Sequence, residues 1–224
     1  MISVIIPTLN EELCIEDTIH PARDGGDVEI IIADGGSNDS TTTIVQHFAD
    51  KIISASKGRA KQMNAGAAAA EGSILLFLHA DTILPVGWVE MIEKALENKN
   101  VAGGAFSFST SGHSKGLKLV TFIVNLRSRV LSLPYGDQAI FIRREHFDAM
   151  EGFKEIPIME DVDLITKMKK RGKLIILQAP VLTSSRRWEK EGWIKTTVRN
   201  QMLLFLYLLG IPPEKLFRFY NNIR

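Results

Sequence analysis

The stretch Leu76-Phe77-Leu78-His79-Ala80-Asp81 is the most informative part of this chain. Residues 74–78 are all apolar and predict a buried strand, and Asp81 follows that strand after only two residues. A buried carboxylate without a partner is costly, so Asp81 must be paired, bound to a metal or at the surface. In an open α/β sheet, ligands bind just beyond the carboxyl ends of the strands. Asp81 is therefore a candidate ligand-binding residue, and capping of the next helix is the alternative.

Strand-like and helix-like segments alternate around this stretch. Strands are expected at 3–6, 28–33, 51–54 and 74–78, and helices at 11–19, 42–48, 59–70 and 87–97. Four strand–helix units in order predict an α/β fold with a doubly wound, mostly parallel sheet, helices on both faces and right-handed crossovers. The second half is more mixed, with strands expected at 105–110, 138–143 and 174–178 and helices at 117–131, 161–170 and 193–209. Because no linker or repeat interrupts the pattern, residues 1–224 are expected to form a single domain.

The composition is that of an ordinary folded protein, with 45% hydrophobic and 24% charged residues. The net charge of +1 provides no global field for nucleic acid, so no nucleic-acid partner is expected. Cys14 is the only cysteine, which excludes an intramolecular disulfide and suits a reducing cytosol. The first residues read as a strand and not as a signal peptide. We therefore expect a cytoplasmic protein.

The last segment of the chain is basic and apolar. Residues 184–224 carry eight Lys or Arg and three Glu, a net charge of +5, which leaves −4 for the rest. The run 202–211 has ten residues, too few for a bilayer span of about 20. Apolar and basic residues between 193 and 224 predict peripheral contact with the inner face of a membrane. The alternatives are packing on the body of the protein or on a second copy in a homodimer.

Two polar loops follow the first two strands. These are Pro7-Thr8-Leu9-Asn10-Glu11-Glu12 and Asp34-Gly35-Gly36-Ser37-Asn38-Asp39. Both are expected at the carboxyl edge of the sheet, where a planar base can bind and Asp34 can accept a hydrogen bond from it. The alternative is two capped helices, with Asn10 at one cap and Asp39 or Ser40 at the other.

A basic turn opens the third expected helix. Lys57, Arg59 and Lys61 surround Gly58, and Gln62 follows. Helix N-termini favour anions, so three cations there are unfavourable unless an anion binds between them. A diphosphate on the free N–H groups of the helix would meet this need. A solvated basic turn is the alternative.

Glu160-Asp161-Val162-Asp163 places three carboxylates at the start of another helix. Complementing the helix dipole explains carboxylates there, although two normally suffice. Asp161 follows the apolar pair Ile158-Met159, which is a good setting for a general base. Asp161, with Glu160 beside it, is therefore the candidate catalytic residue.

Two further segments carry candidate residues for an acceptor or a diphosphate. Tyr135, Asp137 and Gln138 precede an expected strand and can line an acceptor pocket. Arg186 and Arg187 lie beside Trp188, and arginine suits bidentate contact with phosphate. Surface packing of these three side chains is the alternative.

Together these motifs resemble the family-2 glycosyltransferases of the GT-A fold. The resemblance covers nearly the whole chain and rests on residues 3–12, 33–39 and 79–81 and on Glu160-Asp161. Within that family the chain resembles the small bacterial group called selenodomain-associated or radical-SAM-associated transferase 2. That narrower likeness rests on residues 133–138, 159–162 and 185–189.

The resemblance implies a nucleotide-diphosphate sugar as donor and a divalent cation, Mn²⁺ or Mg²⁺, as cofactor. Asp34 is expected to contact the base, Asp81 to hold the metal, and Asp161 to be the general base of an inverting displacement. The acceptor hydroxyl is unknown and can be lipid-linked. The residues expected around the nucleotide are Pro7, Thr8, Asn10, Glu11, Asp34, Lys57, Arg59, Gln62, His79 and Ala80.

Two departures from the family pattern matter. His79 stands where the family's Asp-x-Asp motif has its first aspartate, and imidazole would suit Mn²⁺ better than Mg²⁺ if it were a ligand. Ser184 replaces the glutamine of the Gln-x-x-Arg-Trp motif of processive synthases, which argues against processive synthesis.

We therefore expect a metal-dependent inverting glycosyltransferase with three parts: a nucleotide-binding half (1–100), an acceptor half (101–183) and a C-terminal helical segment (184–224). Nucleotidyl transfer to a sugar phosphate is an alternative, but it would require a Gly-rich loop in place of residues 7–10. A non-catalytic nucleotide-sugar-binding or scaffold protein is the other alternative.

Overall fold

A single mixed sheet connects the two halves of the chain in the computed structural model, which describes residues 1–112 and 114–223. Over these residues the sheet has eight strands in the order β3-β2-β1-β4-β7-β6-β8-β5. Strands β3, β2, β1 and β4 are parallel neighbours, as are β6 and β8, whereas β7 runs antiparallel to β4 and β6, and β5 runs antiparallel to β8. The strands are β1 (Ile2–Thr8), β2 (Val28–Asp34), β3 (Lys51–Ser54), β4 (Ile74–Phe77), β5 (Thr82–Ile83), β6 (Val101–Thr110), β7 (Ile140–Arg143) and β8 (Lys173–Thr183).

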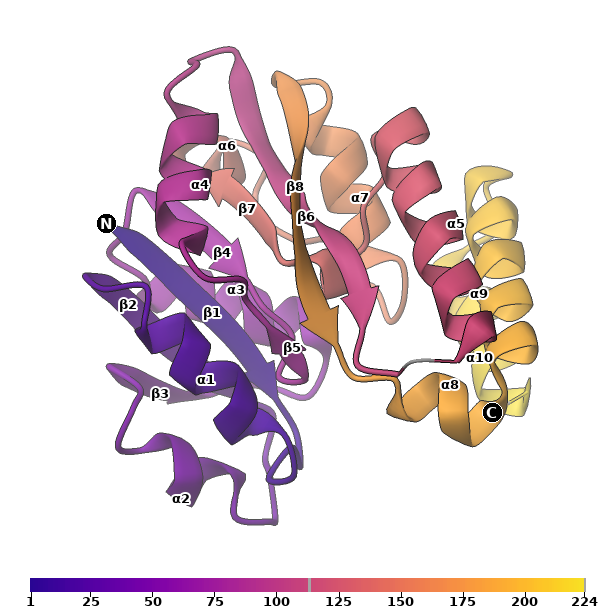
Figure 1. Ribbon diagram of the computed structural model, residues 1–224, viewed down its shortest axis with the longest axis horizontal. Coiled ribbons are helices and arrows are strands. Elements are labelled where there is room, and N and C mark those ends of the chain that lie inside the picture. The colour runs from indigo at the N-terminus through magenta and orange to yellow at the C-terminus, as the bar shows by residue number, and fades with distance from the viewer. Residues whose placement is uncertain (113, 224) are drawn as a thin grey trace.

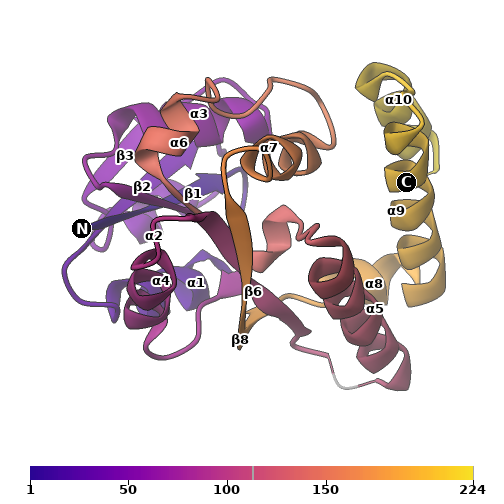
Figure 2. The same cartoon turned by 90° about the horizontal axis from the view of Figure 1, so that it is seen from above.

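Helices cover both faces of this sheet (Figures 1 and 2). On one face, α3, α6 and α7 pack on inward residues such as Ile5 and Phe77. On the other, α1, α2 and α4 pack on Val4 and Ile6. This alternation is the two-residue period of a strand that is buried on both faces. The helices are α1 (Ile15–Arg23), α2 (Thr41–Val45), α3 (Arg59–Ala69), α4 (Trp88–Leu96), α5 (Lys115–Leu131), α6 (Arg144–Asp148), α7 (Glu160–Met168), α8 (Arg186–Glu191), α9 (Trp193–Leu208) and α10 (Pro213–Ile223), with a 3₁₀ turn η1 at Gly136–Gln138.

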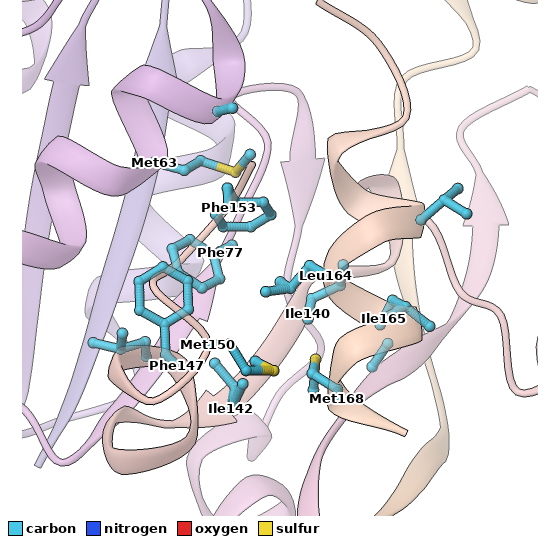
Figure 3. Close-up of a cluster of buried hydrophobic side chains, with 14 of the residues drawn as sticks. Met63, Phe77, Ile140, Ile142, Phe147, Met150, Phe153, Leu164, Ile165 and Met168 are labelled. Carbon is cyan, nitrogen blue, oxygen red and sulfur yellow. The ribbon is translucent and has the colours of Figure 1, made fainter. Parts of the chain in front are cut away.

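Aromatic side chains from the first and second halves of the chain pack together on the face of the sheet that α3, α6 and α7 cover. The rings of Phe77, Phe147 and Phe153 lie with centroids 4.8 to 5.7 Å apart (Figure 3). Methionines such as Met63 and Met168 complete the same cluster between α3 and α7. Aromatic pairs at these separations add stability beyond the area that they bury.

The predicted elements agree with the structure in order, with shifts at their ends. The first helix begins at Ile15 and not at Glu11, because residues 11–14 form a turn. Strand β1 continues through Pro7, which was expected to end it. The backbone carbonyl of Ile5 points toward β4. Backbone groups two residues apart on a strand point to the same side, so the nitrogen of Pro7 also points toward β4. At that level β4 has already ended. The missing N–H of Pro7 therefore removes no ladder bond.

Two elements were not predicted from the sequence, β5 and α6, and two more, α8 and α10, were predicted only as parts of the helical segment 184–224. The strand expected from Gln138 begins at Ile140, because Gln138 belongs to the turn η1. Within the described residues, no helix is long and apolar enough to cross a membrane. Arg224, the last residue of segment 193–224, lies outside the described residues.

Candidate active site

A cleft of about 490 Å³ opens at the carboxyl ends of β1 and β4. Its size is that of a small-molecule site. The walls come from the ends of β1, β4 and β8, the start of α3, the turn η1, and the helices α7, α8 and α9. The lining residues are Pro7, Thr8, Leu9, Glu11, Lys57, Gly58, Arg59, Gln62, His79, Ala80, Asp81, Tyr135, Asp137, Asp161, Thr183, Ser184, Arg187, Trp188 and Asn200.

A second pocket of about 270 Å³ adjoins this cleft. Asp161 lines both cavities, so its carboxylate lies where they meet. The pocket is lined by Arg59, Tyr135, Pro157, Ile158, Met159, Glu160, Asp161, Arg187, Asn200, Leu203, Phe217 and Tyr220. It therefore combines an apolar wall with two guanidinium groups.

The carboxylate of Asp34 is fully occupied by its own loop. Oδ1 accepts from Thr8 Oγ1 (3.0 Å) and Ser37 Oγ (2.5 Å), and Oδ2 accepts from Gly36 N and Ser37 N, both at 2.9 Å. Burial alone would raise the pKa of Asp34, but these hydrogen bonds outweigh it and lower the pKa below its usual value. A carboxylate has about four acceptor sites, and all four are used. Asp34 does not line the cleft as a free acceptor, and its contact with a base stays a prediction.

The other polar residues of these loops bind the two loops to each other. Asn10 Oδ1 accepts from Asn38 N at 2.8 Å, and Glu12 Oε2 accepts from Ser40 N at 2.9 Å. Asp39 accepts from Thr41 N at 3.0 Å, which fits the capping alternative for that residue. The carboxylates of Glu12 and Asp39 therefore fix the backbone of the two loops at this edge of the sheet.

The start of α3 presents cations to the cleft. Gly58 has φ +136° at the N-cap, a conformation that glycine adopts without strain. Lys57 and Arg59 line the cleft, and Arg59 Nη1 lies 3.5 Å from Glu160 Oε1. Gln62 also lines the cleft, but its amide donates to Thr8 O and Ala33 O, both at 2.8 Å. Its NH₂ group therefore joins β1 to β2 and has no hydrogen left for a nucleotide.

Asp81 lies in the cleft with its side chain about one-third exposed. The guanidinium of Arg186 is 4.0 Å from Asp81 Oδ2 and also contacts Glu11 Oε2 at 3.4 Å. No group of three potential metal-ligating side chains occurs in residues 1–112 and 114–223. A single carboxylate is nevertheless a suitable protein ligand for Mg²⁺ or Mn²⁺ when phosphates and water supply the remaining oxygens. The donor set around Asp81 therefore fits a cation that arrives with a diphosphate.

His79 lines the cleft, and Nε2 of its imidazole lies toward Gly136. Nε2 is buried, and within the described residues it has no hydrogen-bond partner. A Cβ added to Gly136 would lie 2.7 Å from Nε2, so only glycine fits opposite this ring. Burial, and then the charges of Arg59 and Arg187, lower the pKa of His79 well below its usual value. The ring is therefore neutral, and its ligation of a metal stays untested.

Glu160 and Asp161 occupy different environments although they are neighbours. Met159, with φ +69°, turns the chain into α7 just before them. Glu160 is buried beside Arg59, and burial is the main reason that its pKa is raised. Asp161 Oδ2 accepts from Gly136 N at 2.9 Å, and Oδ1 from Val162 N at 2.8 Å. Glu160 therefore pairs with Arg59 and lines the smaller pocket but not the cleft, whereas Asp161 is held by backbone N–H groups and lines both cavities.

The turn η1 separates the three residues assigned to the acceptor side. Gln138 is fully buried and bonds to Phe106 O (2.9 Å) and Ser128 Oγ (2.7 Å). It lines neither cavity, so the structure does not bring it together with Tyr135 and Asp137, and its assignment to the acceptor side stays a prediction. Gln138 belongs to the turn η1 and not to the strand, and the hydrogen bonds to Phe106 O and Ser128 Oγ hold its amide inside the fold.

Tyr135 and Asp137, in contrast, remain in the cleft. Burial raises the pKa of Asp137 to about 6, with Arg127 opposing that shift and Asp161 adding to it. Burial likewise raises the pKa of Tyr135. The guanidinium carbon of Arg127 lies 3.4 Å from the centre of the Tyr135 ring. Asp137 Oδ1 and the Tyr135 hydroxyl are buried and have no hydrogen-bond partner within the described residues.

The arginine pair on α8 is also divided. Arg187 lines both cavities, whereas Arg186 lines neither and reaches across to Glu11 and Asp81. Trp188 is mostly buried against Phe108, with ring centroids 5.8 Å apart, although it also borders the cleft. For Trp188 the packing alternative therefore applies, and Arg187 is the candidate for phosphate contact.

Helices α9 and α10 contribute residues that were not predicted. Asn200, Leu203, Phe217 and Tyr220 line the smaller pocket, and Asn200 also borders the cleft. The polar residues that precede the apolar run of α9, Asn200 among them, were the available signal. The sequence pattern of this segment left a membrane, the body of the protein or a second copy as its contact, and it did not indicate a cavity wall.

Comparison with known proteins shows the family to which this sequence belongs. The family model described as "Glycosyl transferase family 2" matches residues 3–149. A probable glycosyltransferase of Bacillus subtilis, YdaM, is 25% identical over 222 residues, and the match covers 85% of this chain and 50% of that protein. Glucosyl-3-phosphoglycerate synthase of Mycobacterium tuberculosis is 33% identical over 96 residues, covering 38% of this chain and 30% of that one. The chain therefore spans half or less of these relatives.

Solved structures show the same fold. Mannosyltransferase PcManGT from Pyrobaculum calidifontis, in complex with GDP-Man and Mn²⁺, has a TM-score of 0.69 at 18% identity, covering 90% of this chain and 61% of that one. Glucosyl-3-phosphoglycerate synthase from M. tuberculosis, in complex with Mn²⁺, UDP and glucosyl-3-phosphoglycerate, has a TM-score of 0.67 at 20% identity, covering 95% and 81%. The fold is thus that of the GT-A glycosyltransferases.

The chain belongs to glycosyl transferase family 2, as its motifs predicted. The narrower likeness to the selenodomain-associated or radical-SAM-associated group stays a prediction.

Proposed function

We propose that this glycosyltransferase is metal-dependent and inverting, and that it moves a sugar from a nucleotide-diphosphate sugar to an acceptor hydroxyl. The observation that carries the proposal is the place of Asp161. It shares one cleft with Asp81 and borders a second pocket in which an acceptor can lie. A base at such a junction can reach both the acceptor hydroxyl and the reacting carbon.

The donor is proposed to be UDP- or GDP-linked. The fold neighbours were solved with UDP or with GDP-mannose, and the cleft here has the size for such a donor. Pro7, Thr8 and Glu11 would border the nucleoside, and Lys57 and Arg187 would face the diphosphate. Arg59 already faces Glu160, so its charge is only partly free for the donor.

Asp81 would hold the divalent cation. When bound, the cation neutralises charge that develops on the departing diphosphate. Arg186, which lies 4.0 Å from Asp81, would keep a counter-charge near this carboxylate when the cation is absent. Among the described residues, Asp81 is the carboxylate that follows the end of β4 and lines the cleft.

Asp161 would act on the acceptor. The acceptor hydroxyl gives its proton to Asp161 as its oxygen attacks the anomeric carbon. The bond between that carbon and the diphosphate oxygen breaks, and the diphosphate leaves with the electron pair. A single displacement from the face opposite the diphosphate inverts the anomeric centre. The bonds from Gly136 N and Val162 N fix the carboxylate for this role.

A panel of nucleotide sugars tests this proposal. Thermal unfolding is measured with each UDP- and GDP-sugar in Mn²⁺ and in a chelator, because a bound donor stabilises the fold by mass action. We expect at least one donor to raise the midpoint only with metal, and product analysis to show the sugar transferred with inversion. Metal-independent binding, retained anomeric configuration or nucleotidyl transfer would each contradict the proposal.

A further inference from the structure

Exposed apolar side chains gather at one end of the molecule. Of the eighteen large apolar residues that are exposed within the described residues, thirteen belong to α5, α9, α10 or Leu209. Soluble monomers rarely expose apolar patches of such extent without a use for them. They are Leu119, Phe122, Leu126, Val130 and Leu131, then Ile194, Val198, Met202, Phe205, Leu208 and Leu209, and finally Phe217 and Phe219.

On α5 and α9 these residues form regular stripes. Leu119, Phe122, Leu126 and Val130 recur at three- and four-residue spacing and lie opposite the residues that α5 buries. Helix α9 repeats the arrangement from Ile194 to Leu209, while its other side buries Leu203 and Leu204. The apolar residues of α9, which were predicted to form part of one surface, are therefore divided between an exposed face and a buried face of the helix. The outer stripes of α5 and α9 are called the apolar layer below.

The two helices pack on each other at the end of the molecule away from α1 and α4 (Figures 1 and 2). Trp193 at the start of α9 packs beside Gly116 of α5. The apolar layer therefore belongs to one structural unit and is not made by a single loose helix.

Helices α5 and α9 themselves carry cations and no Asp or Glu, although Glu189 and Glu191 of the adjacent α8 lie near their first turns. No Asp or Glu occurs from residue 98 to 136 or from 192 to 213. Lys115 and Lys118 of α5 and Lys195 of α9 are exposed, and no ion pair involves them in the described part of the chain. Cations beside an apolar stripe complement anionic headgroups above acyl chains.

A second copy fits this surface less well. A two-fold interface brings the same patch against itself, so the outer faces of α5 and α9 would place Lys115, Lys118 and Lys195 against helices that carry no Asp or Glu. An anionic lipid surface supplies the charge that the apolar layer lacks. We infer that the outer faces of α5 and α9 form a docking surface for an anionic membrane.

This surface is continuous with the smaller pocket through α9. The same helix that exposes Val198 and Phe205 places Asn200 and Leu203 in that pocket. Docking would therefore hold the pocket near the lipid headgroups. The inference itself does not depend on the proposed reaction, because lipid binding is measured without donor or acceptor.

Co-sedimentation with vesicles tests the inference. The full chain is mixed with phosphatidylglycerol–phosphatidylcholine vesicles or with pure phosphatidylcholine vesicles, each at low and high salt. We expect binding to the anionic vesicles at low salt and weakening in high salt, since salt screens exposed charges. Failure of the wild-type chain to bind anionic vesicles more strongly than neutral ones would overturn the inference.

Matched variants separate the membrane from other causes. Phe122→Ser with Phe205→Ser is expected to lower the partition coefficient about tenfold or more, because two membrane-facing rings are lost. Lys118→Glu with Lys195→Glu is expected to reduce anionic binding while the melting temperature is unchanged. Val86→Ser with Lys94→Glu changes equally exposed residues near α4 and should bind as the wild type does.

Light scattering on the same proteins provides a second measurement. A monomer that binds anionic vesicles supports the inference. A dimer that Phe205→Ser dissociates, together with no lipid binding, would show that the occupant is a second copy. Equal loss of binding in the Val86 and Lys94 control would show that the effect is not specific to the apolar layer.

Discussion

The two sides of the cleft differ in how their polar atoms are paired. On the proposed donor side, formed by residues 7–12, 34–40 and the start of α3, Asp34 accepts from its own loop and Glu12 accepts from the neighbouring loop. On the reaction side, formed by η1 and the start of α7, Asp137 Oδ1 and the Tyr135 hydroxyl are buried without a partner within the described residues. Buried polar groups are normally paired, so exceptions mark strained or functional places. The donor side is preorganised, whereas the reaction side keeps unmet bonding capacity for what binds there.

The largest expected effect separates Asp161 from its neighbour. Asp161→Asn should lower kcat by about 10²–10⁴, the usual contribution of a positioned base. Donor affinity should stay near the wild-type value, since the donor side is unchanged. Steady-state kinetics and donor titration measure the two effects. Glu160→Gln is the matched control, and a dead Glu160 variant beside an active Asp161 variant would reverse the two roles.

A second test concerns Asp81. Asp81→Asn should lower metal-dependent nucleotide affinity by at least the roughly 10–100-fold that loss of an outer metal partner costs. The fold should persist, because the side chain is about one-third exposed. Calorimetric titration of UDP and GDP with and without Mn²⁺ measures this. The assignment fails if the variant keeps a full response to metal.

A third test weakens the preorganised side. Asp34→Ala leaves Gly36 N and Ser37 N without their acceptor and should cost about 1–3 kcal/mol of unfolding free energy. Because the folded pKa of Asp34 is lowered, its stabilisation is present above about pH 4 and is lost as pH falls through that lowered pKa. Urea unfolding at pH 7 and pH 3 should show the variant's deficit shrinking in acid. Asp17→Ala, on the exposed side of α1, should show no deficit at either pH.

The smallest effect is expected on the reaction side. The folded pKa of Asp137, about 6, lies above the ordinary value near 3.9, so the ionised form is destabilising. The free energy of unfolding attributable to this group therefore falls as pH rises from about 4 through 6. Asp137→Asn should raise the melting temperature at pH 8 by a few degrees and leave it unchanged near pH 4. Lower thermal stability of the variant at pH 8 would contradict this account.

The sequence predicted the first half of the fold because its strands are marked locally. Residues 28–33 are mostly apolar and end in a Gly-rich loop, which allows a strand and its end to be recognised without tertiary information. Strand β5 has two residues and exists through pairing with β8, a hundred residues further on, so no local pattern marks it. Helix α10 was predicted only as part of the helical segment 184–224, although Pro213 occupies its first position, which is a recognised start signal.

The residues of the candidate site were likewise predicted where the local sequence marks them. Asp81 and Asp161 were identified from their position at the ends of elements, and both lie in the cleft. What the sequence could not show is orientation. Gln62 and Gln138 are polar residues in the expected segments, yet their amides bond to backbone carbonyls inside the fold. Residue type predicts that a polar group needs a partner, but only packing determines which partner it finds.

The pairing of β5 with β8 also has a consequence for folding order. Ser184 N donates to Asp81 O at 3.0 Å, and the hydroxyls of Thr82 and Thr183 are 3.1 Å apart. Contacts of such long sequence separation form late, because the loop must first be closed. During synthesis the strand that ends before Asp81 is complete long before Thr183 leaves the ribosome. The corner of the cleft around Asp81 can therefore assemble only after more than four-fifths of the chain exists, so the candidate metal ligand reaches its final surroundings late in synthesis.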